Sequence, residues 1–138
     1  MRQADKKRLA QYQEKLALVR NSGTPFLESP KQKEVRMRRI KKDIAYMVEY
    51  YFPHYASAEC ADFQIQFAKR VKKNPYYKGF AQWGRGLAKS VWNIVFIPFW
   101  LWINDVPMYY VVIGNNYDRA KQLLDDLRAE LEANPRIV

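Results

Sequence analysis

The first half of the chain repeats apolar residues at the spacing of three and four positions that amphipathic helices require. Residues 4–20 follow this pattern and end in turn-forming residues. A second helix is predicted to begin at the Ser29-Pro30 pair, a cap followed by proline at the first helical position, and to close at Pro53. A third helix is predicted over residues 58–73. The pattern therefore predicts a helical first half.

The pattern changes after residue 75. Residues 76–83 and residues 108–114 are rich in aromatic and β-branched side chains and are predicted as strands, the second of them buried. Between them, a glycine-bearing loop at residues 84–90 leads into an apolar stretch at residues 91–103, which is predicted as a helix. A last amphipathic helix follows at residues 117–133. Strand, loop, helix, strand and helix is the order of a parallel α/β sheet.

Charged residues are unevenly distributed along the chain. The formal net charge is +10, and residues 1–75 hold 17 Lys and Arg against 8 Asp and Glu, a balance of +9. Such a basic section favours polyanionic partners such as nucleic acid or nucleotides. Cys60 is the only cysteine, which excludes a disulfide framework and fits a reducing, intracellular setting. The most apolar stretch is shorter than the ~20 residues of a membrane span, so no membrane partner is expected.

The loop at residues 84–90 stands where a phosphate-binding P-loop would stand, between a predicted strand and a predicted helix. It contains the Lys89-Ser90 pair of that motif, whereas Trp83 and Ala88 occupy the positions of its two glycines. The loop would act by aiming backbone N–H groups at phosphates, helped by the N-terminus of the following helix. Ala88 would be strained if its position requires a positive φ.

The loop motif leads to a fold prediction for the whole chain. We expect an α/β protein with an incomplete parallel sheet of the P-loop NTPase type, preceded by a helical N-terminal section. Residues 1–57 would form the basic helical leader, and residues 58–138 the front part of a P-loop ATPase domain that ends before its Walker B strand.

Residues 85–90, with the sequence RGLAKS, resemble the variant Walker A loop of phage terminase large subunits, the ATP-driven motors that package DNA. In that family an arginine opens the loop, and the residue before the lysine is Gly or Ala. Residues 111–137 resemble the strand and helix that follow in the family. The resemblance covers about residues 60–138 and is most specific at the loop and at residues 114–137.

The resemblance implies a role for the loop residues. Lys89 would reach the β- and γ-phosphates of ATP, Ser90 would bind Mg²⁺, and Arg85 would act on the charge that develops on the γ-phosphate, so that Arg85 and Lys89 are the implied catalytic residues. Family members also bind adenine through an upstream glutamine, for which Gln66 is the first choice and Gln64 the second; an ordinary solvated glutamine is the alternative. The implied phosphate-binding residues are Gly84, Arg85, Gly86, Leu87, Ala88, Lys89 and Ser90.

A P-loop ATPase also needs a Walker B acid to hold Mg²⁺. Residues 107–138 contain no apolar strand that ends in such an acid, and the carboxylates there are predicted to form the solvated face of a helix: Asp125, Asp126, Glu130 and Glu132. The sequence therefore predicts that this chain binds ATP. ATPase activity and the nuclease domain are expected only in the full-length protein. The resemblance implies double-stranded DNA, a portal protein and a small terminase subunit as partners, a homo-oligomeric motor, and the host cytoplasm as location.

The basic run at residues 31–42 supports a second hypothesis. Its cations are candidates for contact with DNA phosphates, although a merely solvated helix face has the same charge pattern: Arg36, Arg38, Arg39, Lys41 and Lys42. In this alternative, the chain is a non-catalytic basic helical module that binds nucleic acid or another subunit. His54, the only histidine, has no metal-ligating neighbours in sequence and is expected in a turn or in packing.

Overall fold

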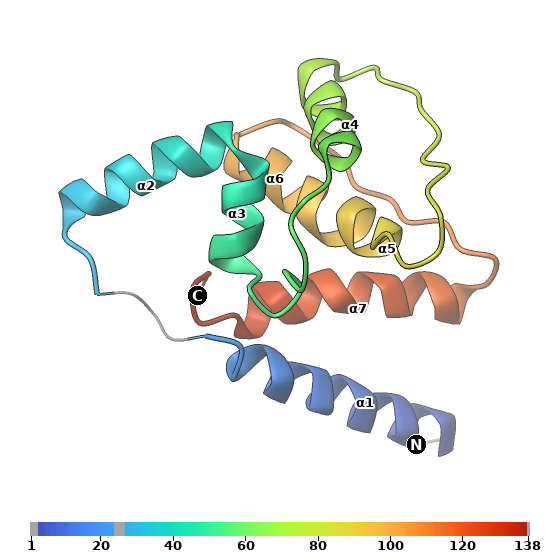
Figure 1. Cartoon of the computed structure of the whole chain (residues 1–138). Helices are drawn as coiled ribbons and strands as arrows, with labels where there is room; N and C mark the ends of the chain where they lie inside the picture. The colour runs from blue at the N-terminus through green and yellow to red at the C-terminus, as the bar shows by residue number, and fades with distance from the viewer. Residues whose placement is uncertain (1–2, 24–26, 138) are drawn as a thin grey trace.

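The computed structural model describes residues 3–23 and 27–137, and every regular element within them is helical (Figure 1). The elements are α1 (Gln3–Arg20), α2 (Pro30–Lys42), α3 (Ile44–Tyr51), α4 (Asp62–Lys73), α5 (Lys89–Val91), η1 (Trp92–Phe96), α6 (Ile97–Ile103) and α7 (Tyr117–Ala133). Because α5, η1 and α6 follow one another without a break, they form a single helix over residues 89–103 with a π-helical turn in its middle. Among the described residues, no helix combines the length and apolar character that a bilayer crossing demands.

The predicted α/β fold is wrong, because residues 3–23 and 27–137 contain neither strand nor sheet. Residues 76–83 and residues 108–114, both predicted as strands, run as irregular segments over the helices. Their outward side chains are almost completely exposed: Phe80 is 94% and Tyr109 95% accessible. A strand is stable only when a neighbour takes up its backbone N–H and C=O groups. The parallel sheet of the P-loop NTPase type is therefore absent from the described part of the chain.

The helices predicted in the first half are present, and local hydrogen bonds explain where they begin. α2 begins at Pro30 as predicted, because the Ser29 hydroxyl accepts the N–H of Gln32 at 3.3 Å and the Gln32 side chain accepts the N–H of Ser29 at 2.8 Å. The helix expected to continue towards Pro53 is interrupted at Asp43, whose carboxylate caps a new helix, α3. The interruption turns α3 away from the axis of α2 (Figure 1).

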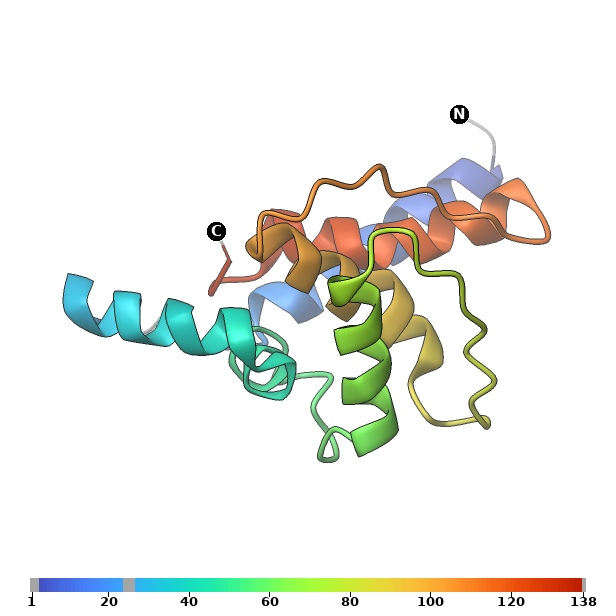
Figure 2. The same cartoon turned by 90° about the horizontal axis from the view of Figure 1, so that it is seen from above.

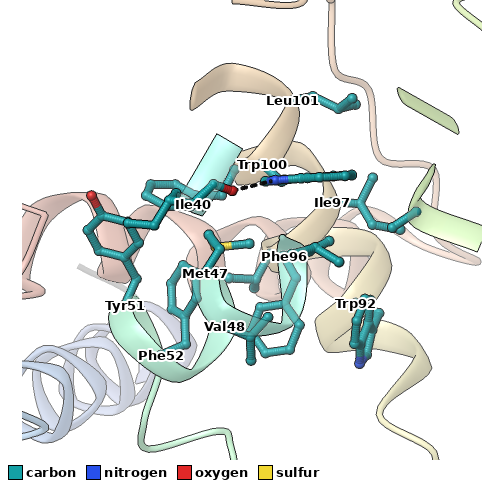
Figure 3. Packing of buried hydrophobic residues seen from close by; sticks show 14 residues of the cluster. Ile40, Met47, Val48, Tyr51, Phe52, Trp92, Phe96, Ile97, Trp100 and Leu101 are labelled. Carbon is teal, nitrogen blue, oxygen red and sulfur yellow. Dashed lines mark hydrogen bonds between the residues drawn. The ribbon is translucent and has the colours of Figure 1, made fainter. Parts of the chain in front are cut away.

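The break between α2 and α3 leaves two carbonyl groups that other helices use. Nε1 of Trp100 donates to the carbonyl oxygen of Ile40 at 2.9 Å, and this bond is buried (Figure 3). Nζ of Lys72 donates to the carbonyl oxygen of Lys41 at 2.8 Å and lies 4.4 Å from the centre of the Trp100 ring. Burial lowers the pKa of Lys72, and the nearby Lys41 acts in the same direction. These contacts hold α4 and α6 against the end of α2.

The hydrophobic core lies between α2 and α3 on one side and the helix over residues 89–103 on the other (Figure 3). Phe52 is inaccessible to solvent, and its ring centre lies 5.2 Å from those of both Phe96 and Phe99. Burying one such side chain stabilises the fold by roughly 1.5–3 kcal/mol. The core therefore joins residues from both sides of residue 57. Its most deeply buried members include Ile40, Ile44, Met47, Val48, Phe52, Trp92, Val95, Phe96, Phe99 and Trp100.

Helices α1 and α7 lie side by side and run in the same direction (Figures 1 and 2). Val19 packs against Ala129 and Ala133 in a small second core. Polar contacts continue the pairing away from this core, where Arg8 in the first half of α1 forms an ion pair with Asp125 in the middle of α7 at 3.1 Å. α7 begins as predicted, because the Asn116 side chain accepts the N–H of Arg119 at 2.8 Å.

Candidate functional site

The loop predicted to bind phosphate, residues 84–90, is exposed along its whole length. Gly86 has a φ of +80°, and Ala88 has a φ of +51° with a ψ of +26°, so both adopt left-handed backbone conformations. The conformation of Ala88 costs roughly 1–2 kcal/mol, because its Cβ crowds the following carbonyl oxygen. The strain anticipated at Ala88 is therefore present. Strained residues of this kind concentrate at binding sites, where the surrounding structure holds them in place.

The left-handed residue Ala88 turns the chain directly into the helix over residues 89–103. The first backbone hydrogen bond of this helix runs from the N–H of Trp92 to the carbonyl of Ala88 at 3.0 Å. The N–H groups of Lys89, Ser90 and Val91 therefore have no partner inside the helix. Together with the helix dipole, three such groups attract an anion to this end of the helix.

Arg85 and Lys89 place two cationic side chains at the same helix end, and both residues are exposed. Within residues 3–23 and 27–137, neither forms an ion pair, so both charges are available to an anionic ligand. Ser90, the predicted Mg²⁺ ligand, is exposed beside them. The described residues contain no group of three side chains able to hold a metal ion. The loop thus offers charge and N–H donors for phosphate, with one hydroxyl for a cation.

Of the two glutamines proposed for adenine, Gln64 lies against the loop and Gln66 does not. Nε2 of Gln64 donates to the carbonyl oxygen of Leu87 at 2.9 Å, and its Oε1 accepts the N–H of Ala61 at 2.9 Å. Gln64 is buried, whereas Gln66 is exposed on α4. The second choice from the sequence is therefore the one that contacts the loop, where it holds the Leu87 carbonyl in place.

Trp83, which occupies the first glycine position of the P-loop motif, anchors the start of the loop. Its ring centre lies 5.2 Å from that of Phe63, 5.6 Å from that of Phe67 and 6.4 Å from that of Trp92, all in edge-to-face arrangements. Such aromatic pairs stabilise a fold by more than the burial of their apolar area alone contributes. The Trp83 side chain thus fixes the loop between α4 and η1, a position that glycine could not hold.

A cavity of about 300 Å³ lies behind the loop. It is lined by the segment before α4, the first turn of α4 and the start of the helix over residues 89–103. Its volume equals the lower limit of ordinary small-molecule pockets. Burial raises the pKa of Cys60 in its wall, so the thiol stays protonated there. The wall combines aromatic rings with one amide and includes Tyr55, Cys60, Gln64, Leu87, Trp92 and Phe96.

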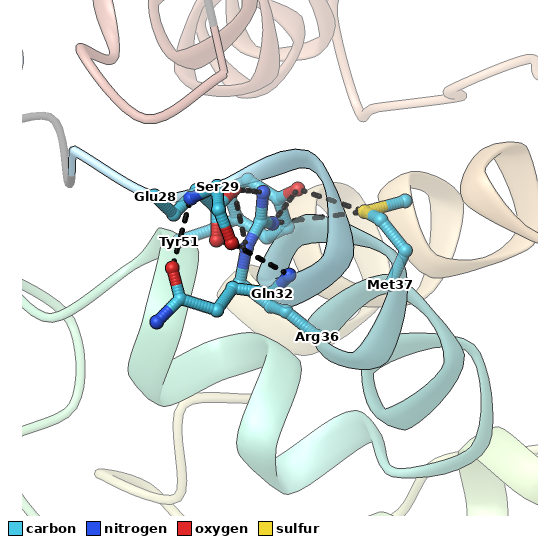
Figure 4. A network of polar contacts seen from close by, with 6 residues as sticks. All are labelled: Glu28, Ser29, Gln32, Arg36, Met37 and Tyr51. Carbon is cyan, nitrogen blue, oxygen red and sulfur yellow. Dashed lines mark hydrogen bonds and ion pairs between the residues drawn. The ribbon is translucent and has the colours of Figure 1, made fainter.

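The five basic residues of α2 proposed for DNA contact are in different environments, and Arg36 is already engaged (Figure 4). Its Nε donates to the Glu28 carboxylate oxygens at 2.9 and 3.1 Å, and its Nη1 donates to the Tyr51 hydroxyl at 3.2 Å. Its guanidinium group also lies 4.5 Å over the Tyr50 ring. These hydrogen bonds lower the pKa of Glu28 and raise that of Arg36. Arg36 therefore ties the segment before α2 to α3.

The other four residues of the set proposed for DNA contact are more open to an anion. The ion pairs of Arg38 at 2.5 Å and Lys41 at 3.1 Å are both with exposed carboxylates, and pairs of that kind contribute little to stability. The Arg39 guanidinium lies 3.8 Å over the Tyr46 ring of α3, and Arg39 remains exposed. Lys42 is exposed at the end of α2.

The prediction of a solvated acidic face on α7 is wrong for Glu130, which is inaccessible to solvent. Oε1 of Glu130 lies 2.7 Å from Nε2 of His54, and Oε2 accepts a hydrogen bond from Nδ2 of Asn134 at 2.8 Å. Asn134 also donates to the carbonyl oxygen of Tyr51 at 2.6 Å. A buried carboxylate requires such partners. His54 lies in a turn, as predicted, and is in addition the partner of a buried acid; the sequence signal for that burial was the position of Glu130 beside the small residue Ala129.

Comparison of the chain with protein-family models, curated proteins and solved structures finds no match.

Proposed function

We propose that residues 84–90 bind the phosphates of ATP with Mg²⁺, as the nucleotide-binding part of a viral DNA-packaging terminase large subunit. The observation that carries the proposal is the coincidence of charge and backbone donors at one helix end. Arg85 and Lys89, which form no ion pair with any described residue, belong to a strained loop, and the first three N–H groups of the following helix have no partner inside that helix. The resemblance of RGLAKS to the variant Walker A loop supports the terminase assignment. The proposal does not require a sheet, because the phosphate contacts come from the loop and the helix end.

Each proposed contact uses a group that is open in the structure. Lys89, at the first position of the helix, reaches the terminal phosphates, and the exposed Arg85 neutralises charge from within the loop. The Ser90 hydroxyl binds the Mg²⁺ that accompanies ATP. The proposal for this site is binding of Mg-ATP.

The cavity behind the loop is the proposed site of the adenine base. It is lined by aromatic rings on which a flat base can lie, and Gln64 presents an amide at its wall. Gln64 donates to the Leu87 carbonyl, so hydrogen bonding to adenine would exchange that bond for one to the base. Base binding and loop conformation would therefore be linked through Gln64.

Lys89→Ala tests the proposal. We expect Mg-ATP affinity, measured by titration calorimetry, to fall at least about tenfold, because a charge-assisted hydrogen bond to phosphate contributes roughly 1.5–3 kcal/mol. Lys78→Ala is the matched control, because Lys78 is an exposed lysine outside the loop. Circular dichroism establishes that both variants keep their helices. A wild-type chain that does not bind Mg-ATP, or equal affinities for the two variants, contradicts the proposal.

A second candidate function is a non-catalytic basic helical module that binds nucleic acid or another subunit through α2. It is supported by the openness of four of the five α2 side chains proposed for DNA contact; within residues 3–23 and 27–137, none of these four forms a buried ion pair. The same Lys89→Ala variant separates the two functions. Loss of Mg-ATP binding with unchanged affinity for DNA favours the first, whereas DNA binding without any binding of Mg-ATP favours the second.

A further inference from the structure

A groove of about 620 Å³ lies between α2, the end of α6 and the C-terminal residues. Both views place α2 and the C-terminal end on the same side of the molecule (Figures 1 and 2). The groove has an apolar floor that includes Met37, Phe99, Ile103 and Ile137. Its charged residues are four cations and a single acid: Lys33, Arg36, Lys41, Arg136 and Asp105. It therefore fits a ligand that is both anionic and partly apolar.

Trp102 lines this groove and is unusually open for a tryptophan. Its side chain is 59% accessible, whereas Trp92 and Trp100 are 2% and 1% accessible. Its ring centre lies 5.7 Å from that of Phe99, so one edge of the indole is supported by the core. A flat aromatic surface beside cationic side chains is the arrangement that proteins use to stack nucleic-acid bases.

Two lysines of α2 supply open positive charge along the groove. Lys33 is exposed and, in the part of the chain that the structure describes, forms no ion pair; Lys41 pairs only with the exposed carboxylate of Asp105. The two lysines are separated by eight positions, so they lie ~12 Å apart along the helix axis. That separation spans more than one phosphate of a nucleic-acid strand. Arg36 and Arg136 add positive potential while remaining anchored to Glu28 and to the Tyr50 carbonyl.

We propose that this groove binds single-stranded nucleic acid, with a base stacked on Trp102 and two phosphates of the same strand on Lys33 and Lys41. The proposal rests on nucleic-acid binding by the basic module, the second candidate function, and names its site and ligand. A base within a duplex is already stacked on both faces, so only an unpaired base can lie on the indole. An acidic peptide would satisfy the lysines but would leave the exposed indole without a partner.

The first test is fluorescence anisotropy of a labelled short oligothymidine with the full chain. Trp102→Ala is expected to weaken binding about tenfold, as loss of a base stack does elsewhere. Trp102→Phe keeps a ring on the same support and is expected to retain most of the affinity. Tyr117→Ala, which removes an exposed ring on α7 outside the groove, is the control and should bind as the wild type does.

The second test measures how the affinity depends on salt. Lys33→Ala is expected to reduce the slope of log K against log salt by about 0.7, the contribution of one phosphate contact on a single strand. Lys69→Ala, on the exposed side of α4, should leave the slope unchanged. Polyglutamate serves as a competitor, and it should displace the oligonucleotide no better than salt at equal charge.

The outcomes distinguish failure of the groove proposal from failure of the second candidate function, nucleic-acid binding. If the oligonucleotide binds and neither Trp102→Ala nor Lys33→Ala changes the binding, the groove proposal is overturned while nucleic-acid binding stands. If polyglutamate competes strongly and Trp102→Ala has no effect, the groove accepts acidic peptides and the proposal is also overturned. No binding of any oligonucleotide removes both the proposal and the second candidate function. None of these results depends on ATP binding at residues 84–90.

Discussion

Two regions of the molecule carry similar amounts of aromatic and branched side chains but have different structures. Residues 30–52 form α2 and α3 and bury Ile44, Met47, Val48 and Tyr51 of α3. Residues 104–116 instead follow α6 as an irregular segment with Tyr109 and Ile113 exposed. The difference shows what helices and strands each require. A helix satisfies its hydrogen bonds within itself and needs only one surface to pack on. A strand also needs a neighbouring strand, which residues 104–116 lack among the described residues.

One side chain nevertheless fastens the irregular segment. The hydroxyl of Tyr110 donates to the carbonyl oxygen of Asn93 at 2.8 Å. In the π-helical turn the N–H of Ile97 bonds to the carbonyl of Trp92, and the next residue, Pro98, has no N–H to offer to Asn93. The Tyr110 hydroxyl therefore donates the hydrogen bond to the Asn93 carbonyl that Pro98 cannot donate. Near its start the segment is also held by the N–H of Val106, which donates to the carbonyl of Leu101 at 3.0 Å, and beyond that point the Tyr110 phenol takes the place of a ladder of backbone bonds.

The largest expected effect comes from removing a core ring. Phe52→Ala should lower the free energy of unfolding by about 3–5 kcal/mol, because Phe52 is inaccessible and packs between two other rings. Tyr109→Ala, in the irregular segment, should change it by no more than about 0.5 kcal/mol. Urea titration followed by circular dichroism measures both. A large loss of stability in Tyr109→Ala would show that the irregular segment packs far more tightly than its exposure indicates.

A smaller effect is expected in the loop at residues 84–90. Gly86→Ala should destabilise the chain by roughly 1–2 kcal/mol, because a Cβ at a φ of +80° is strained although no atom lies within 4 Å of it. Gly84→Ala is the matched control, since its φ is not positive and its Cβ would make only an ordinary contact with Leu87. Thermal unfolding compares the two. Equal melting temperatures would contradict the left-handed conformation at Gly86.

The smallest expected effect concerns Tyr110 and alkaline pH. Burial raises the pKa of Tyr110 from 10.0 to about 12, so the folded chain keeps the phenol proton that the unfolded chain loses above pH 10. The stability contributed by neutral Tyr110 is therefore complete below pH 10 and is lost as the pH rises to about 12. After allowance for the exposed part of the ring, we expect a loss of about 1 kcal/mol.

Comparison with Tyr110→Phe isolates this contribution, because other tyrosines with raised pKa values titrate equally in both proteins. Urea titrations at pH 9 and pH 11.5, or at similar values on either side of the window, should show a smaller alkaline loss in the variant. Identical losses in the two proteins would mean that Tyr110 is not buried in solution.

Part of the candidate site could be predicted from the sequence. The exposed loop with glycines ahead of a Lys-Ser pair, and the helix after it, follow from local residue types, and so does the strain at Ala88. The sequence did not show which glutamine contacts the loop. Gln66 and Gln64 are equally polar and two positions apart, and only the packing of α4 decides that Gln64 contacts Leu87. The placement of Trp102 in a basic groove was equally hidden, because its neighbours come from α2 and from the C-terminal residues.

By itself, the sequence determined the helices with strong local signals: the Ser29-Pro30 start of α2, the Asn116 start of α7, and the apolar helix that follows the loop. Those signals work because caps and helical hydrogen bonds join residues only a few positions apart. Only the tertiary structure decided that residues 108–114 form no strand and that Glu130 is buried against His54. Strand formation and the burial of a charge both depend on groups contributed by distant parts of the chain, which no local pattern specifies.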